Sequence, residues 1–247
     1  MSALRAAWRL LNVGVQLAGG LVICATVFPF IGAGQRLQHV GRWSRRTLRA
    51  LGIGLVAKGT VHPGATLFVA NHVSWLDILA INAVQPVRFV SKADVRAWPV
   101  LGWLVECGGT LFIERERKRD ALRVVHLVAE ALRAGEKIAV FPEGTTSVGH
   151  AVLPFHANLL QAAIATETPV QPVVLRFADA REPVSPAAAF IGEQTLAASL
   201  WAVLNAKGMV AHVELLPAQG TRHLDRRALA AKLQGEIAAA LDAGLAR

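Results

Sequence analysis

The chain has 247 residues, enough for one large domain with its own hydrophobic core. Its formal net charge of +9 and its hydrophobic fraction of 53% favour an anionic partner, such as a membrane surface, an acidic carrier or nucleic acid, over a plain solvated basic surface. Two cysteines, Cys24 and Cys107, are too few for a disulfide framework or a metal cluster, so both are expected to be small buried hydrophobes.

The first predicted element is an apolar helix near the N-terminus. No charged residue occurs from Leu10 to Gln35, and Pro29 interrupts this run. Leu10 to Phe28 would reach about 28 Å as a helix, close to the hydrocarbon thickness of a bilayer. A cleaved signal peptide is disfavoured because the run is long and lacks a clear small-residue cleavage site. A buried core helix remains the alternative to a membrane element.

A basic segment follows at residues 36–51. Its apolar residues recur near helical spacing and arginines fill the other positions, which predicts a helix on an anionic membrane face with Trp43 at the interface. A basic helix packed on the domain surface is the alternative. Only Arg5 and Arg9 precede the apolar run, so the charge bias places the body at the cytoplasmic face of the cell inner membrane. We therefore expect membrane-anchoring helices over residues 1–50.

Residues 51–247 form the predicted main domain, in which short apolar runs alternate with longer helical patterns. This alternation predicts an α/β fold with a mostly buried mixed sheet flanked by helices. The predicted strands lie near residues 54–58, 66–70, 87–90, 110–114, 138–141, 170–176 and 210–216. The predicted helices lie near residues 75–84, 100–106, 119–134, 155–166, 195–206 and 225–243.

The segment N-H-V-S-W-L-D at residues 71–77 has two interpretations. Ser74 and Asp77 ahead of an apolar run resemble a capping box, which would leave His72 as a loop histidine bonded to backbone. Alternatively, Asp77 in the first helical turn reaches back to His72, fixes its tautomer and makes it a general base. These residues alone favour the capped turn. A metal site is not expected, because no second histidine lies at ligand spacing.

Three further stretches bear on this choice. The run G-G-T-L-F-I-E-R ends a predicted strand with Arg115, F-P-E-G-T-T-S places Glu143 in a loop, and T-P-V-Q-P-V-V opens a strand at Pro169. Ligands usually bind where strand ends meet at one edge of an α/β sheet. We therefore expect the His–Asp pair, a cationic cluster and a hydroxyl-rich turn to meet there.

In this order and spacing, the motifs resemble those of the lysophosphatidic acid acyltransferase family of glycerolipid acyltransferases, over residues 51–216. Asn71, His72 and Asp77 match its N-H-x-x-x-x-D motif. Residues 109–115 match G-x-x-F-I-x-R, and residues 141–145 match F-P-E-G-T. Pro169, Val170 and Pro172 match its proline-bearing strand.

This resemblance implies an enzyme that transfers an acyl group from acyl-CoA or acyl carrier protein to the sn-2 hydroxyl of lysophosphatidic acid, giving phosphatidic acid. His72 would be the general base and Asp77 would orient it. No metal and no cofactor beyond the acyl donor is implied, and the partners are the lysolipid acceptor, the donor and an anionic membrane. The expected substrate-binding residues are Asn71, Arg115, Glu143, Gly144, Thr145 and Thr146.

Two departures from the family pattern bear on the acceptor. Thr146 stands where the family commonly has arginine, and His156 stands where it commonly has lysine. Threonine does not reproduce a bidentate arginine–phosphate contact, so a lyso-ornithine lipid or another lysophospholipid is the alternative acceptor. A non-catalytic basic membrane-binding protein is the alternative from another class. Nucleic-acid binding is disfavoured, because the chain shows no recognised motif or aromatic ladder.

Overall fold

The computed structural model describes residues 2–113 and 118–246. Seven strands form one sheet in the order β1-β7-β6-β2-β5-β3-β4. All neighbouring strands are parallel except the β6–β7 pair, which is antiparallel, so the predicted mixed sheet is confirmed. The strands are β1 (Gly54–Lys58), β2 (Thr66–Ala70), β3 (Arg88–Lys92), β4 (Leu111–Ile113), β5 (Lys137–Val140), β6 (Val170–Ala178) and β7 (Val210–Leu215).

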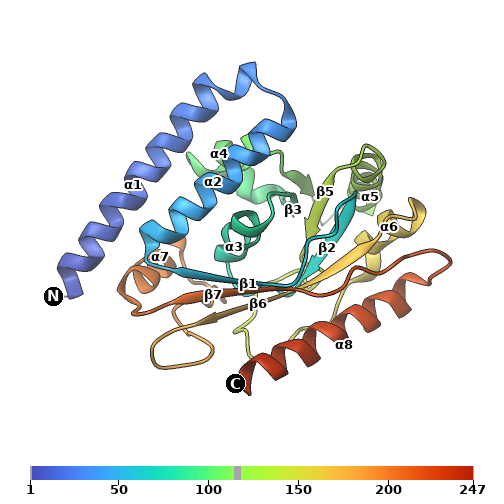
Figure 1. The fold of residues 1–247 in the computed structure, drawn as a ribbon. Helices are drawn as coiled ribbons and strands as arrows, with labels where there is room; N and C mark the ends of the chain where they lie inside the picture. Colours follow the sequence, from blue (N-terminus) through green and yellow to red (C-terminus); the bar gives the residue numbers. More distant parts are fainter. Residues whose placement is uncertain (1, 114–117, 247) are drawn as a thin grey trace.

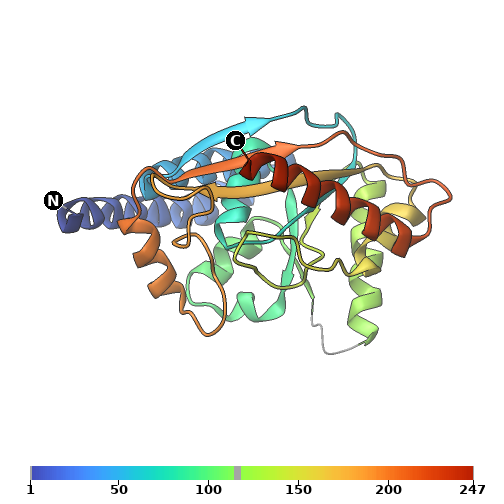
Figure 2. The same cartoon turned by 90° about the horizontal axis from the view of Figure 1, so that it is seen from below.

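Helices cover both faces of the sheet, as Figures 1 and 2 show. One face carries α1 (Ser2–Thr26), α2 (Ala33–Leu51), α3 (Leu76–Val84) and α7 (Leu196–Asn205). The opposite face carries α5 (Lys118–Arg133), α6 (Leu160–Ala165) and α8 (Arg226–Leu245). The short helix α4 (Leu101–Cys107) follows the 3-10 turn η2 (Ala93–Ala97) after β3, and η1 (Phe28–Phe30) links α1 to α2.

The central strand β2 contributes side chains to a hydrophobic cluster on each face of the sheet. Phe68 and Ala70 pack into the cluster under α2, α3 and α7, whereas Leu67 and Val69 pack into the cluster under α5, α6 and α8. Both faces are therefore buried, which requires a continuous apolar run rather than alternation. The α/β prediction and the position of β2 follow directly from such a run.

The predicted helix at residues 155–166 is shorter in the structure. The backbone N–H of His156 donates to the Pro142 carbonyl at 2.9 Å, and His156 has extended dihedral angles. A 3-10 turn, η3 (Ala157–Leu159), then leads into α6. The backbone of His156 therefore binds the loop that contains Pro142, and the α-helix begins only at Leu160.

The N-terminal helix α1 is apolar and largely uncovered. Within the stretch Ala3–Phe30, the most apolar 18-residue window has a mean hydropathy of 1.9 and is 17% buried, so by length and composition alone the stretch could cross a membrane. Ala6 and Val13 pack into the core, whereas Trp8 is 66% exposed and Leu11 is 60% exposed. Such exposure does not fit the alternative of a buried core helix.

Both ends of α1 contact the body of the protein. Near its start, the Arg9 Nη1 donates to the carbonyls of Leu204 and Ala206 at 2.9 and 2.8 Å, which satisfies backbone acceptors at the end of α7. Near its other end, a side chain added at Gly20 would meet Leu104 of α4. The hydrophobic core therefore continues from the N-terminal helices into the rest of the chain, and a domain boundary at residue 51 stays a prediction.

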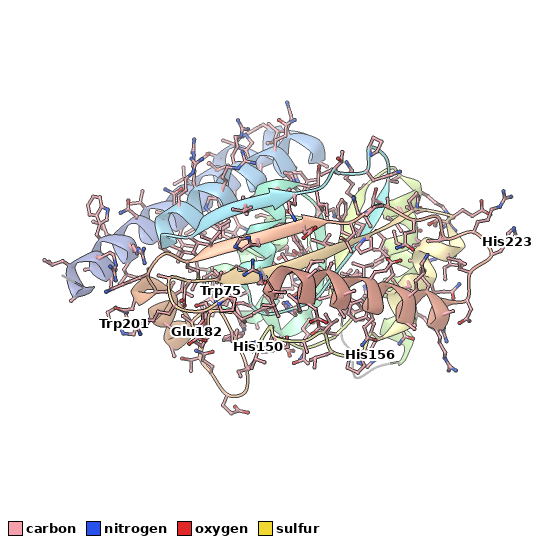
Figure 3. All side chains as sticks on the ribbon, turned by 60° about the horizontal axis from the view of Figure 1, so that its bottom comes forward. Trp75, His150, His156, Glu182, Trp201 and His223 are labelled. Carbon is pink, nitrogen blue, oxygen red and sulfur yellow. The ribbon has the colours of Figure 1, made fainter. Side chains whose placement is uncertain are left out.

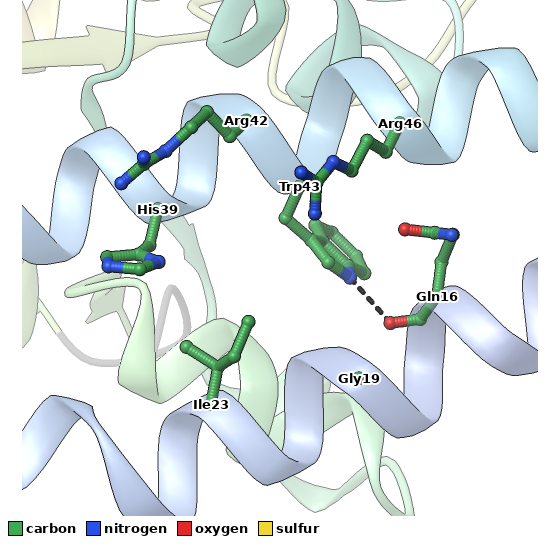
Figure 4. A pocket seen from close by; sticks show the side chains of 7 residues that line it. All are labelled: Gln16, Gly19, Ile23, His39, Arg42, Trp43 and Arg46. Atoms are coloured by element: carbon green, nitrogen blue, oxygen red, sulfur yellow. Dashed lines mark hydrogen bonds between the residues drawn. The ribbon is translucent and has the colours of Figure 1, made fainter.

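The side chain of Trp43, a residue of α2, lies against α1. The sequence predicted this tryptophan at the membrane interface. Its indole Nε1 donates to the Gln16 carbonyl at 2.8 Å, and its side chain is half-buried (Figure 4). Arg42 and Arg46 lie on either side of it and line a cleft of about 190 Å³. The tryptophan thus joins the two helices, and the arginines occupy the exposed side of α2.

Candidate active site

The candidate site lies at the carboxyl ends of two neighbouring parallel strands. His72 follows β2 by two residues and Glu143 follows β5 by three, and β2 and β5 pair in parallel. The two loops are joined directly, because the His72 backbone N–H donates to Glu143 Oε1 at 3.1 Å and the Ser147 N–H donates to the His72 carbonyl at 2.8 Å. Strand ends therefore bring these motifs together, as predicted.

His72 and Asp77 form a close pair. The His72 Nδ1 lies 2.7 Å from Asp77 Oδ2, and the Asp77 side chain is 0% exposed while that of His72 is 19% exposed. The same Oδ2 also accepts the backbone N–H groups of Val73 and Ser74 at 2.7 and 2.9 Å. One carboxylate therefore fulfils both interpretations of this segment: it caps the helix entry and it binds the histidine.

Ser74 contributes less than the capping-box pattern predicts. Its hydroxyl is buried and has no hydrogen-bond partner among the described residues, and the Asp77 N–H instead donates to the Ser74 backbone carbonyl at 3.1 Å. Only the carboxylate half of the box is formed. A fully buried hydroxyl also cannot reach a bound substrate, which argues against Ser74 as a nucleophile.

The plane of the His72 ring is fixed by Phe141. The two rings stack with centroids 4.0 Å apart and an interplanar angle of 11°. Because Nδ1 is engaged by a carboxylate, the hydrogen-bond pattern assigns the proton to Nδ1 and leaves Nε2 as the free basic nitrogen. The arrangement can therefore accept a proton from a hydroxyl placed beside Nε2. The sequence motif contained Phe141 but did not indicate this stacking role.

Glu143 is buried, in contrast to the headgroup contact expected of it. Its side chain is 4% exposed and it holds the His72 backbone. Burial is the main cause that raises the pKa of this carboxyl to about 7, and the negative charge of Asp77 adds to the rise. The N–H groups of His72 and Leu153 act in the opposite direction. We infer that Glu143 positions the histidine loop.

The three residues after Glu143 differ in backbone conformation, exposure and hydrogen bonding. Gly144 has a φ of +73°, a left-handed conformation that glycine adopts without strain, and its N–H donates to the Phe141 carbonyl at 3.1 Å. Thr145 is exposed, whereas the Thr146 hydroxyl donates to the Phe190 carbonyl. Thr146 thus ties this turn to the loop before α7, which leaves Thr145 as the exposed hydroxyl of the predicted set.

Asn71 braces the sheet beneath the site. Its Nδ2 donates to the Leu175 carbonyl at 2.9 Å and its Oδ1 accepts the Leu175 N–H at 2.8 Å, which joins the end of β2 to β6. The side chain is 1% exposed, so both of its polar groups are used away from solvent. We infer a positioning role in place of the expected substrate contact.

Arg115 lies outside the described residues. The strand before it, β4, ends at Ile113, whose register partner is Lys92 at the carboxyl end of β3. Lys92 is exposed at the same edge of the sheet as His72. Lys92 is not among the predicted site residues, although a lysine that ends an apolar strand was a usable signal. His156, at the position where lysine was expected, is exposed (Figure 3).

The segment between His72 and Asp77 is also held from α7. Trp75 Nε1 donates to the hydroxyl of Ser199 at 3.0 Å, and Ser199 is fully buried. Figure 3 labels Trp75 together with Trp201, which lies on the same helix as Ser199 and is 55% exposed.

In the described part of the chain, no group of three or more histidine, cysteine or acidic residues could hold a metal ion.

Comparison with known proteins identifies the family. The Acyltransferase family profile matches residues 56–176. The chain is 38% identical over 200 residues to a lyso-ornithine lipid O-acyltransferase of Pseudomonas aeruginosa, covering 81% of this chain and 76% of that one. It is also 38% identical over 200 residues to a 1-acyl-sn-glycerol-3-phosphate acyltransferase of Neisseria meningitidis, covering 79% and 77%.

A solved structure shows the same fold. The 1-acyl-sn-glycerophosphate (LPA) acyltransferase PlsC from Thermotoga maritima superposes with a TM-score of 0.75 at 20% identity, covering 100% of this chain and 97% of that one. The sequence relatives show the family, and the solved structure shows the fold. The chain is an acyltransferase and belongs to the glycerolipid acyltransferase family that includes the 1-acyl-sn-glycerol-3-phosphate acyltransferases.

Proposed function

We propose that this enzyme transfers a fatty acyl group from acyl-CoA or acyl carrier protein to the sn-2 hydroxyl of lysophosphatidic acid, giving phosphatidic acid. The observation that carries the proposal is the 2.7 Å contact between His72 Nδ1 and the buried Asp77 carboxylate. It leaves Nε2 as a base at the carboxyl edge of the sheet, where substrates of α/β enzymes bind.

The proposed reaction needs no nucleophile from the protein. His72 Nε2 takes the proton of the acceptor hydroxyl as its oxygen attacks the thioester carbonyl of the donor. The tetrahedral intermediate collapses, the carbon–sulfur bond breaks, and the imidazolium returns the proton to the leaving thiolate. Asp77 stabilises the imidazolium and keeps the ring in one tautomer. Glu143 holds the backbone of His72, and Asn71 holds the strand that precedes it.

A lyso-ornithine lipid is the second candidate acceptor. Thr146 supplies no cation for a phosphate, and its hydroxyl is already bonded to Phe190. Relatives from Pseudomonas aeruginosa and Brucella abortus carry the name lyso-ornithine lipid O-acyltransferase. The exposed Lys92 at the same edge of the sheet supports the phosphate-bearing acceptor instead, and we propose that Arg115 adds a second cation.

We further propose that the enzyme is membrane-bound at the cytoplasmic face of the inner membrane, through residues 1–50. The support is the uncovered apolar side of α1 and the exposed arginines of α2. Arg9 near one end of α1 is bonded to α7, and the other end packs on α4. A helix fixed to the same body at both ends lies along the membrane surface, with its apolar side in the acyl-chain region.

An acceptor panel tests the function. Purified protein in detergent is given acyl-CoA or acyl carrier protein together with lysophosphatidic acid, lyso-ornithine lipid or lysophosphatidylethanolamine, and product is measured by mass spectrometry. We expect the largest kcat/KM with lysophosphatidic acid and almost no product with His72→Ala. A larger kcat/KM with lyso-ornithine lipid would select the second candidate. Product formation by a folded His72→Ala protein would refute the proposed chemistry for both.

A further inference from the structure

A cavity lies at the amino ends of the strands, at the opposite end of the sheet from His72. It has a volume of about 980 Å³ and is bounded by the turn between α1 and α2, by α4, and by the starts of β3 and β5. We call it the amino-end cavity. Strand β5 separates the two places: Lys137 at its start borders this cavity, and Phe141 just after its end stacks on His72. Four residues of extended chain span about 13 Å.

The charges around the amino-end cavity do not cancel. Its two acidic residues are each paired with an arginine, Glu136 with Arg88 and Glu106 with Arg96. Two further cations, Arg36 and Lys137, line the cavity and have no ion-pair partner within residues 2–113 and 118–246. The cavity therefore carries a net positive charge, which favours an anionic occupant.

Arg36 is held in place for such a contact. Its Nε donates to the Ile31 carbonyl at 3.1 Å, and its guanidinium lies 6.0 Å from the centroid of the Phe28 ring. One of the five N–H donors of a guanidinium is thus used on the turn, and the others are left for a ligand. Lys137 is half-buried at the start of β5, where a charged group gains more from an anion than at a fully exposed position.

The remaining wall of the cavity is apolar. Phe28, Leu37, Pro86 and Trp103 line it, and Trp103 is 43% exposed. The wall includes Phe28 and Pro29 of the turn between α1 and α2, where the neighbouring Phe30 is 85% exposed. A cavity with cations on one side and aromatic and aliphatic groups on the other matches a molecule that has an anionic head and a hydrocarbon tail.

We propose that the amino-end cavity binds an anionic membrane phospholipid, with its phosphate between Arg36 and Lys137 and an acyl chain along Phe28, Leu37 and Trp103. The proposal goes beyond the acyl-transfer reaction and does not depend on it, because the cavity and His72 lie at opposite ends of the sheet. The occupant is a lipid rather than free phosphate, because the apolar wall opens toward the apolar turn of the N-terminal helices.

Cys107 provides a reporter for occupancy. The chain has two cysteines, Cys24 and Cys107, and both line the cavity. In Cys24→Ala protein, held in an uncharged detergent, Cys107 is the single thiol, and its rate of alkylation by a small maleimide is measured. Dihexanoylphosphatidylglycerol, used below its micelle concentration, should slow this alkylation in a saturable manner. Native mass spectrometry of the unaltered protein counts bound lipid independently of the cysteine replacement.

Charge variants test the two cations. Lys137→Gln and Arg36→Gln should each weaken binding about tenfold or more, as expected for the loss of one charge-assisted contact. Lys137→Arg should retain binding. The matched control is Arg226→Gln with Arg227→Gln, which removes two exposed charges from the start of α8 on the other face of the sheet, and should leave binding unchanged.

Three results would overturn the proposal. Equal protection by dihexanoylphosphatidylcholine would show that negative charge is not selected. Equal protection by inorganic phosphate or glycerol 3-phosphate would show that the apolar wall adds nothing. Unchanged lipid binding in a folded Arg36→Gln, Lys137→Gln double variant, measured by native mass spectrometry, would show that the lipid binds elsewhere.

Discussion

Asp77→Asn separates the two functions of one carboxylate. Asp77 Oδ2 accepts three hydrogen bonds, two from backbone N–H groups and one from His72. The asparagine carbonyl can still accept the two backbone bonds, so the helix entry should keep its cap. The negative charge is lost, however, and the amide can no longer both accept from Nδ1–H and stabilise an imidazolium.

The expected magnitudes differ between stability and rate. Changing charge-assisted bonds into neutral ones should lower the free energy of unfolding by about 1–3 kcal/mol, less than the usual stability of a domain. Loss of a positioned general base should lower the transfer rate about 10²–10⁴-fold. His72→Ala should have a similar effect, and the double variant should be little worse, because the two residues act as one unit.

The assay is thiol release from acyl-CoA in the presence of a saturating lysolipid, with melting temperature measured on the same samples. Asp225→Asn is the matched control, because Asp225 also accepts two backbone N–H groups at a helix start, at 2.9 and 3.0 Å, but contacts no histidine. It should lower stability slightly and leave transfer unchanged. If Asp77→Asn behaved like this control, with near-normal transfer, the catalytic interpretation of the pair would be wrong.

Glu143→Gln should flatten the pH dependence of stability. Burial raises the pKa of the Glu143 carboxyl in the folded protein to about 7 from 4.5, so the folded state binds this proton more tightly than the unfolded state does. The free energy of unfolding of the native protein should therefore fall as pH rises through that window, by at most about 3 kcal/mol. Melting curves at pH 5 and pH 8 check this, and an equal slope in both proteins would contradict the assignment. Thr146→Arg should raise kcat/KM for phosphate-bearing lysolipids relative to lyso-ornithine lipid, and an unchanged ranking would show that Thr146 does not set acceptor choice. Arg115→Ala should raise the acceptor KM about tenfold or more with little change in melting temperature, as for one lost charge-assisted contact. The protein should sediment with membranes after a wash in 1 M salt, where the Debye length is about 3 Å, whereas replacing Trp8, Leu11 and Val15 with serine should release it into the supernatant.

The elements that local sequence dictates could be predicted well. Strands β1 and β2 lie at the residues expected from their apolar runs, and the His72–Asp77 contact joins residues only five apart, which one turn of helix brings together. The predicted order of α-helices and strands matches the structure, and long segments such as α5 and α8 are the ones whose periodicity is clearest.

The roles of several site residues depended on distant backbone groups and could not be predicted. Asn71 bonds to Leu175, which is 104 residues away, and Glu143 bonds to the backbone of His72, which is 71 residues away. Thr146 bonds to the Phe190 carbonyl, 44 residues later. A backbone carbonyl or N–H leaves no signature in the sequence, so each of these polar side chains was assigned to the substrate. The bond from Trp43 to the Gln16 carbonyl could not be predicted for the same reason.

The bond between Arg9 and the end of α7 has a consequence for biosynthesis. Its two partners are 195 residues apart in the sequence, so α1 leaves the ribosome long before the carbonyl of Leu204 exists. At about 5–20 residues per second, that interval lasts about 10–40 s. Throughout this time the nascent chain displays Trp8, Leu11 and Val15, and although α2 is made soon after α1, the α7 carbonyls that Arg9 binds do not yet exist. On the proposal that the enzyme is membrane-bound, a lipid surface reached during translation would shelter the helix until α7 is made, which favours synthesis on membrane-bound ribosomes over insertion of the finished protein.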